Sequence, residues 1–289
     1  MANETSDKTD RAAPETEFGG ENAPRLTEEE KHEVEELKQL RVPVVYEIIR
    51  EEGVEELKRP VPSLWWSGLA GGIAISVSVL AEGLLHRYLP DTQWRPLVEN
   101  FGYCVGFLIV ILGRLQLFTE NTITVIFPLL TDFSKSHLYF TMRLWGVVLF
   151  ANMCGTFAVA LLTLYGGIIQ PESVAAMLSI SHHLVVYSAS QALLYGIPAG
   201  FLVAAIVWIM PSAEYAGFWV IVIVTYIIAL GGFTHVVAGS NEVFLLILNG
   251  DITVQTGVVG LLLPTLIGNI IGGTGLFAML AHRQVREEI

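Results

Sequence analysis

A histidine lies inside a long apolar stretch of the chain, and it is the side chain there with the clearest capacity for chemistry. The stretch runs from about Phe218 to Leu248, and its middle reads Gly231-Gly-Phe-Thr-His-Val-Val-Ala-Gly-Ser-Asn-Glu242. Ionisable groups at membrane depth are costly, and they usually mark a path for a solute or a proton. An imidazole there can donate a hydrogen bond to an oxyanion or exchange a proton. We therefore interpret Thr234 and His235 as lining such a path.

The apolar stretch around His235 is longer than one membrane-spanning helix. Such a helix needs roughly 20 apolar residues, and backbone leaves the helix at membrane depth only where it is buried in protein or lines a cavity. The sequence therefore predicts two half-helices joined by a break. The alternative to a functional His235 is a buried imidazole that bridges the two ends of the break. Within a membrane we favour the functional interpretation.

A second apolar region, at about 101–131, is also too long for one span. Its middle reads Leu117-Phe-Thr-Glu-Asn-Thr-Ile123, so we expect a second break that contains Thr119 and Glu120. Helix breaks free backbone N–H groups, and helix N-termini favour anions. The apolar side chains beside these polar groups, Leu117, Phe118 and Phe233, are predicted to form constrictions at which a solute loses its water.

Composition indicates a charged segment followed by a membrane protein. Of 289 residues, 53% are hydrophobic, and the mean hydropathy is +0.56. Residues 1–60 hold 17 of the 28 acids and 9 of the 16 bases, which leaves an apolar body with few charges. No nucleophile, metal-ligand cluster or nucleotide-binding loop indicates an enzyme, and no basic patch indicates nucleic acid. We expect no cofactor and no bound metal.

The apolar body predicts an all-α protein with six transmembrane helices, the second and the fifth broken. The apolar regions lie at about 64–86, 101–131, 143–165, 191–210, 216–248 and 257–281. Lys and Arg residues are more frequent on the side of the two termini, which places both termini in the cytoplasm of a cell whose inner membrane holds the protein.

Short motifs recur in the same order in the two halves of the apolar body. Phe118-Thr119 matches Phe233-Thr234, Asn152-Met-Cys-Gly155 matches Asn269-Ile-Ile-Gly272, and Gly68-Leu-Ala-Gly-Gly72 matches Gly196-Ile-Pro-Ala-Gly200. Because each half has three spans, the second half begins on the opposite side of the membrane. The pattern predicts an inverted 3+3 repeat whose breaks face each other at mid-membrane.

The segment before the membrane body divides into two parts. Residues 1–25 have few large apolar side chains and are predicted to be a disordered acidic tail. Residues 26–59 are predicted to be a cytoplasmic amphipathic helical segment, which begins with a capping box from Thr27 to Glu30. We favour docking of this segment on its own protein over binding of a partner. Residues 60–289 are predicted to be a transmembrane channel domain.

Other polar residues of the apolar body have structural interpretations. Asn152 and Asn269 are expected to hydrogen-bond between helices. Arg114 and Glu120 either pair across the first break or serve an interface. Glu82 is expected to reach water at the end of the first span. Glu242 is expected to cap the half-helix that follows Ser240.

These motifs resemble those of the formate/nitrite transporter family across about residues 60–282. The anchors are Leu117-Phe-Thr-Glu-Asn-Thr122, Gly232-Phe-Thr-His-Val-Val-Ala238 and Gly268-Asn-Ile-Ile-Gly-Gly273. The resemblance implies an aquaporin-like fold and a homopentamer with a pore in each protomer. It also implies passage of small monovalent anions or their acids. Within the pore it implies a central His235 with Thr119 opposite, and a constriction at Leu117 and Phe118.

The chain departs from the family pattern beside these anchors. Thr234 stands where the family has a glutamate before the central histidine, and Gly239 stands where it has an asparagine. Glu120 stands where the family has a glycine, and Gln116 where it has an acid. The chain therefore resembles a divergent branch of the family.

The sequence supports three hypotheses for function. The first is a passive or proton-coupled channel for formate, nitrite or a similar small anion, in which Glu120 favours passage as the neutral acid. The second keeps the fold but carries a neutral solute or a cation. The third is a non-conducting membrane scaffold or sensor that acts through the N-terminal helices.

Overall fold

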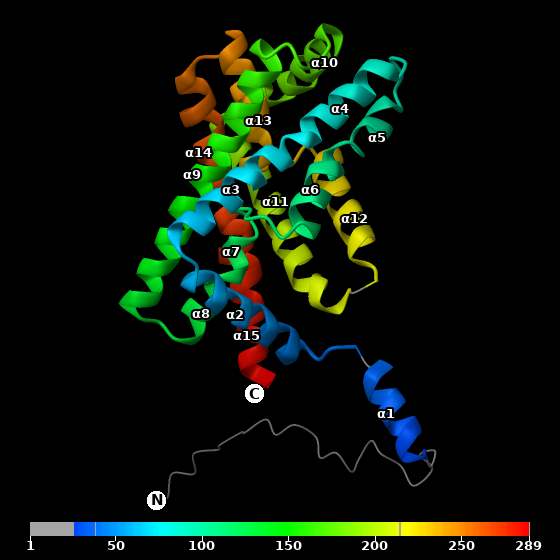
Figure 1. Ribbon diagram of the computed structural model, residues 1–289, viewed down its shortest axis with the longest axis vertical. Helices are drawn as coiled ribbons and strands as arrows, with labels where there is room; N and C mark the ends of the chain where they lie inside the picture. The colour runs from blue at the N-terminus through cyan, green and yellow to red at the C-terminus, as the bar shows by residue number, and fades with distance from the viewer. Residues whose placement is uncertain (1–25, 38, 214, 289) are drawn as a thin grey trace, which may run out of the picture. The chain divides into compact units, whose positions relative to one another are not determined.

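The computed structural model describes residues 26–37, 39–213 and 215–288, and every regular element in these ranges is helical. The chain separates into two compact units, Met1–Gln39 and Leu40–Ile289. In chain order (Figure 1) the elements are α1 Glu28–Leu37, α2 Val42–Lys58, α3 Val61–Ile75, α4 Val77–Tyr88, α5 Arg95–Glu99, α6 Tyr103–Leu112, α7 Asn121–Thr124, α8 Ile126–Thr131, α9 Lys135–Tyr165, α10 Pro171–Ser181, η2 His182–Val186, α11 Ala189–Ile209, η3 Met210–Ser212, α12 Gly217–Leu230, α13 Val236–Asn249, η4 Thr256–Leu262, α14 Leu263–Ile270, η5 Ile271–Ala278 and α15 Met279–Glu288.

The first unit contains α1, which begins with the predicted capping box. The Thr27 N–H donates to the Glu30 carboxylate at 2.7 Å, and the Glu30 N–H donates to the Thr27 hydroxyl at 3.2 Å. The hydrogen bond from the Thr27 backbone lowers the pKa of Glu30. The predicted acidic tail, residues 1–25, lies outside the described residues.

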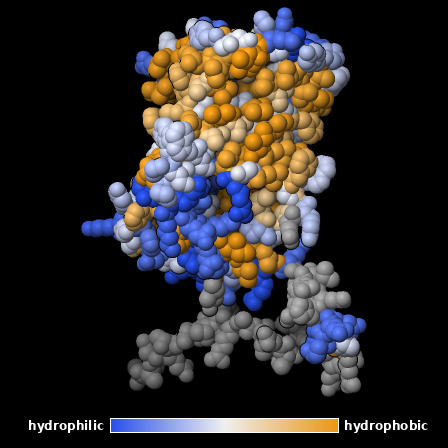
Figure 2. Space-filling view, viewed as in Figure 1, coloured by the Kyte–Doolittle hydropathy of each residue, from blue (hydrophilic) through white to orange (hydrophobic). Residues whose placement is uncertain are grey.

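The second unit is built mainly from long apolar helices. Among the described residues, five helical stretches are long and apolar enough to cross a membrane: Val61–Tyr88, Arg95–Leu112, Lys135–Tyr165, Ala189–Ser212 and Thr256–Glu288. Shorter apolar helices at Asn121–Thr131, Gly217–Leu230 and Val236–Asn249 flank the two predicted breaks. Large apolar side chains such as Trp66, Phe150 and Trp219 are exposed, and apolar residues cover most of the visible face of this unit (Figure 2). Such a surface suits a lipid environment.

Two helix pairs in the unit approach closely by the same means. A Cβ on Gly72 of α3 would overlap the Asn152 carbonyl of α9, and a Cβ on Gly200 of α11 would overlap the Asn269 carbonyl of α14. Small residues allow helix backbones to approach in membranes, where packing replaces the hydrophobic effect. These crossings bring both asparagines toward the two breaks.

The helix α2 packs against the membrane helices at the end where α15 and α8 lie (Figure 1). Its buried residues include Val45, Ile49 and Leu57. The Tyr46 hydroxyl lies 2.6 Å from Nδ1 of His282 on α15. The helix α2 continues through Gly53 to Lys58. Gly53 is placed directly against the backbone of α7, where any side chain would overlap it.

Candidate functional site

The two predicted breaks are present, and both begin with the same backbone turn. The helix α6 ends at Leu112 and α12 ends at Leu230. After each end, one residue adopts a left-handed conformation, Arg114 with φ 51° and Gly232 with φ 62°. The following N–H then reaches back five residues, from Leu115 to Val110 and from Phe233 to Ile228, both at 3.0 Å. This is a common way to end a helix, and glycine is the residue that adopts it without strain.

Arg114 adopts this strained conformation in the first break, so we expect Arg114→Gly to stabilise the protein. A left-handed conformation costs a non-glycine residue roughly 1–2 kcal/mol, part of which is offset by the flexibility of glycine in the unfolded chain. The net gain is expected to be about 0.5–1 kcal/mol, measured as a higher midpoint of thermal unfolding in detergent. Arg114→Ala removes the same charge but keeps the strain, and should show no gain. Equal stabilisation by both variants would contradict this explanation.

Two buried asparagines hold the extended backbone of the breaks. The Asn152 side chain accepts from the Phe118 N–H at 3.0 Å and donates to the carbonyls of Gly68 and Gln116 at 2.7 and 2.9 Å. Each asparagine is fully buried, so these bonds satisfy backbone groups that no water reaches. The expected hydrogen bonding between helices is therefore confirmed for Asn152.

Asn269 repeats this arrangement at the second break. It accepts from the Val236 N–H at 2.8 Å and donates to the carbonyls of Gly196 and Thr234 at 2.8 and 2.9 Å. By these contacts Thr234 occupies the place that Gln116 has in the first break. The matching Phe-Thr dipeptides of the sequence are therefore not in equivalent positions.

His235 and Thr119 meet where the two breaks face each other. The Thr119 hydroxyl lies 2.8 Å from Nε2 of His235, and both residues are buried. His235 is also the N-cap of α13, because its Nδ1 accepts from the Ala238 N–H at 3.1 Å. An Nδ1 that accepts carries no hydrogen, so the neutral ring carries its hydrogen on Nε2 and donates it to Thr119. The Thr119 hydroxyl hydrogen has no other acceptor among the described residues.

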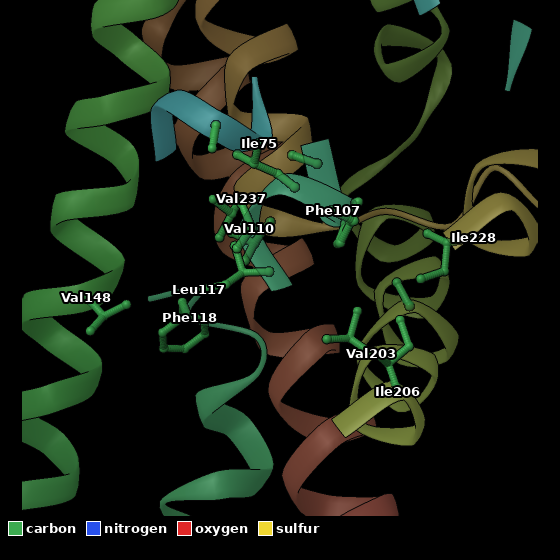
Figure 3. Close-up of a cluster of buried hydrophobic side chains, with 14 of the residues drawn as sticks. Ile75, Phe107, Val110, Leu117, Phe118, Val148, Val203, Ile206, Ile228 and Val237 are labelled. Carbon is green, nitrogen blue, oxygen red and sulfur yellow. The ribbon is translucent and has the colours of Figure 1, made fainter. Parts of the chain in front are cut away.

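Apolar side chains surround this contact. Leu117 and Phe118 lie on the extended segment between α6 and α7, with Val110 and Val237 beside Leu117 (Figure 3). Leu117 and Phe118 are 0% and 1% exposed. The ring of Phe107 meets His235 edge-on, with 5.1 Å between ring centres. The polar pair therefore lies within an apolar layer.

A cavity of about 310 Å³ reaches this layer from one side, and we call it the outer cavity after the orientation that the sequence predicts. His235, Thr234 and Phe233 line it. Its titratable side chains otherwise come from α4, α5, α6, η2 and α13: Glu82, His86, Glu99, Tyr103, His183 and Glu242. The Thr234 hydroxyl donates to the Ala192 carbonyl at 2.7 Å, so this side chain is already partnered.

A second cavity, of about 360 Å³, is lined by Glu120, the residue that follows Thr119, and we call it the inner cavity after the orientation that the sequence predicts. Its charged lining is Glu52, Glu55, Glu56, Arg114 and Glu120. The Gln116 side chain on its wall donates to Glu56 at 2.9 Å and so joins α2 to the first break. Burial raises the pKa of Glu52, and Glu56 and Glu55 add to this while Arg114 opposes it. The lining is acidic overall.

The structure brings most of the predicted site residues together but corrects one expectation. His235, not Glu242, caps α13, and Glu242 faces the outer cavity. Glu82 is half-buried and lines the same cavity. Arg114 and Glu120 both line the inner cavity, but no ion pair within 4.0 Å joins these two described residues.

Several residues of the site were not identified from the sequence. Phe107 lies in a plain apolar run, and nothing in its spacing distinguishes it from lipid-facing neighbours. Glu52, Glu55 and Glu56 belong to a helix that precedes the membrane body. Their charge was visible in the sequence, but the docking of α2 that brings them to the cavity depends on tertiary packing.

Comparison with known proteins assigns the chain to a family. Residues 43–283 match the sequence model of the formate/nitrite transporter family. The inner membrane protein YfdC of Escherichia coli (strain K12) is 37% identical over 288 residues, covering 98% of this chain and 91% of that protein. The formate channel BtFdhC of Bacillus thuringiensis is 26% identical over 251 residues, covering 83% of this chain and 94% of that protein.

Solved structures share the fold. A pentameric formate channel with formate bound aligns with a TM-score of 0.67 at 20% identity, covering 78% of this chain and 98% of the other. An ion channel of the same family aligns with a TM-score of 0.70 at 19% identity, covering 83% and 98%. The match of residues 43–283 to the family model and the 37% identity to YfdC establish that the chain belongs to the formate/nitrite transporter family.

Proposed function

We propose that the protein is a channel for small monovalent weak acids, of which formate is the first candidate, and that they pass as the neutral acid. The observation that carries the proposal is the contact between Nε2 of His235 and the Thr119 hydroxyl, in which His235 lines the outer cavity and Thr119 precedes Glu120 of the inner cavity. Both groups bond a carboxylic acid well, and the apolar layer around them excludes water.

The charges near the contact support passage as a neutral molecule. An anion held in an apolar layer needs a positive partner, since an isolated charge is very costly to bury. His235 is the nearest titratable group, and its cap to Ala238 keeps the ring neutral. On the inner side an anion would meet Glu120 and the α2 glutamates, with Arg114 as the cation of the lining. A proton that travels with the anion removes this penalty.

We infer further that six spans form an inverted repeat. Each half then contributes one of the two broken helices that meet at the contact of Thr119 with His235. The equivalent bonds of Asn152 and Asn269 support this inference, as do the equivalent helix ends at Arg114 and Gly232. In such a repeat the solute path runs at the interface of the halves, near the middle of the membrane. The polar groups along the pore are then Thr119, Thr234, His235 and Glu120. The constrictions are formed by Leu117, Phe118 and Phe233.

The assembly proposed is a homopentamer in the inner membrane, with a pore in each protomer and both termini in the cytoplasm. Support comes from the likeness of the fold to a pentameric formate channel and from the similarity of the sequence to an inner membrane protein of Escherichia coli. On the outer surface, apolar side chains such as Trp66 and Phe150 are available for lipid or for neighbouring copies.

Flux measurements in proteoliposomes test the proposal. With an inward pH gradient, labelled formate should enter faster than into protein-free liposomes, and the rate should follow the concentration of formic acid. Because a neutral molecule carries no charge, clamping the membrane potential with valinomycin and potassium should leave the rate unchanged. Uptake equal to that of protein-free liposomes would refute the proposal.

A second candidate function is transport of a neutral solute or a small cation. It is favoured by the acidic lining of both cavities, with Glu82, Glu99 and Glu242 on the outer side and Glu120 on the inner side. Acid-lined clefts concentrate cations and repel anions. Uptake that rises with an inside-negative potential, together with formate uptake at the background rate, would favour this second candidate.

A further inference from the structure

The proposed function requires a proton donor for the anion, and His235 is poorly placed to be one. Its Nδ1 accepts from the Ala238 N–H, and its Nε2–H is directed at Thr119. A second proton on Nδ1 would break the cap. It would also put a positive charge at the N-terminus of α13, where the helix dipole disfavours it. The donor should therefore be sought elsewhere in the outer cavity.

His183, on η2, has the features of such a donor. It lines the outer cavity, and its side chain is 49% exposed, so water reaches it. Its Nδ1 lies 2.6 Å from the Ile180 carbonyl. A carbonyl only accepts, so Nδ1 keeps its hydrogen in this bond and Nε2 is the nitrogen that gains and loses a proton. Histidine is the side chain whose charge ordinarily changes between about pH 5 and 8.

Glu242 lies beside His183 and has no hydrogen-bond partner for its carboxylate among the described residues. Its side chain is only 8% exposed, and its Oε1 lies 3.7 Å from Nδ1 of His183. A buried carboxylate without hydrogen bonds is costly unless a positive charge is near. An ionised Glu242 would therefore attract the protonated ring of His183 and hold it over the cavity.

The other titratable side chains around this pair are carboxyl groups, phenols and one further imidazole. They are Glu82 and His86 from α4, Glu99 from α5, Tyr103 from α6, Tyr187 after η2 and Tyr195 from α11. His86 is held by Glu99 at 2.9 Å. The elements α10, α12, η4 and α14 add no titratable side chain to the lining. Within the described lining, His183 is thus the exposed imidazole without a hydrogen-bonded acid.

We propose that His183 is the proton-donating residue of the outer cavity, with Glu242 as the positioning residue that holds its imidazolium. This inference rests on the proposed function. The Nε2–H bond of the imidazolium breaks and an O–H bond of the carboxylic acid forms. The neutral acid moves on to the contact of Thr119 with His235. Nε2 then takes a proton from the outer solution, and the donor is ready for the next anion.

The chain offers a matched control in His182, the adjacent residue of η2. Its Nδ1 lies 2.7 Å from the Leu178 carbonyl and its Nε2 lies 3.4 Å from Asp251, but it does not line the outer cavity. Formate uptake into proteoliposomes is compared for the unaltered protein, His183→Ala and His182→Ala at outer pH values from about 5 to 8. His183→Ala should lower the rate about tenfold or more, since a positioned general acid contributes at least this much. His182→Ala should keep the rate.

Two further measurements separate proton donation from a structural role. Imidazole added to the outer solution should restore formate uptake by His183→Ala, because it replaces the missing donor. Formamide, which is neutral and of similar size, should enter at the same rate through all three proteins.

Three outcomes would overturn the inference. If His183→Ala takes up formate as fast as the unaltered protein, His183 donates no needed proton, although the proposed function stands. A parallel loss of formate and formamide uptake without rescue by imidazole would show that His183 only maintains the structure. If the unaltered protein itself takes up no formate, the proposed function fails and this inference fails with it.

Discussion

Replacing His235 with phenylalanine is expected to lower formate flux by about tenfold to a hundredfold. The substitution removes the Nε2–H donor at the contact with Thr119 and leaves an aromatic ring in an already apolar layer. A polar solute that loses a buried hydrogen bond there is destabilised by about 1–3 kcal/mol, and each 1.4 kcal/mol is a factor of about ten in rate. The rate of labelled formate uptake into proteoliposomes measures the effect.

A control variant separates transport from folding at this position. His235→Phe also removes the cap of α13, which alone costs about 1 kcal/mol of stability. His235→Asn keeps a side-chain acceptor for the Ala238 N–H but is too short to reach Thr119 at 2.8 Å. It should therefore unfold at nearly the temperature of the unaltered protein and still transport slowly. Full flux in His235→Phe would contradict a role for the imidazole.

Replacing Asn269 with leucine is expected to destabilise the protein by about 3 kcal/mol or more. The leucine leaves the Val236 N–H and the carbonyls of Gly196 and Thr234 without a partner in a fully buried place. Each such orphaned group costs about 1–3 kcal/mol. The midpoint of thermal unfolding in detergent and the yield of folded protein on gel filtration measure the loss.

Graded variants make this prediction specific. Asn269→Asp keeps the acceptor for Val236 but loses both donors, so its loss should be intermediate. Ile267, on the same helix, is 43% exposed, and Ile267→Ala should change stability by much less. If Asn269→Leu unfolds at the temperature of Ile267→Ala, the hydrogen bonds to the break do not carry the stability assigned to them.

The breaks could be predicted because their signals are local. An apolar run too long for one span, interrupted by glycine and polar residues, leaves few arrangements that satisfy the backbone in a membrane. Asn152 and Asn269 could be identified because an amide inside a span needs partners on other helices. The contact of Thr119 with His235 was expected because the resemblance placed these residues on opposite sides of a pore, and the structure brings them to hydrogen-bonding distance.

The repeated motifs did not predict correctly which residues of the two halves occupy equivalent positions. Phe118-Thr119 and Phe233-Thr234 look alike, but the asparagine contacts pair Gln116 with Thr234. The asparagine bonds only backbone groups, so the side chains of the break are not constrained by it. The phenylalanine can therefore lie at a different distance from the helix end in each half. The strained Arg114 was equally hidden, since arginine gives no sign of a left-handed turn.

The cavity walls were the least predictable part of the site. Their carboxylates come from segments far apart in the chain, such as Glu56 on α2 and Glu242 on α13. Which face of α2 meets the membrane helices depends on the packing of Gly53 against α7. A glutamate within a span is compatible with a helix cap or a cavity wall until its neighbours are known, which is why the predicted role of Glu242 was wrong.

The most direct test of passage as a neutral acid is the pH inside proteoliposomes after formate is added outside. Liposomes that contain the protein and a trapped pH indicator are compared with protein-free liposomes, with the membrane potential clamped. If the acid passes the contact of His235 and Thr119 as a neutral molecule, the interior acidifies faster with the protein, and the initial rate rises with the outer concentration of formic acid. Acidification no faster than in protein-free liposomes, or formate uptake without acidification, would contradict this mechanism.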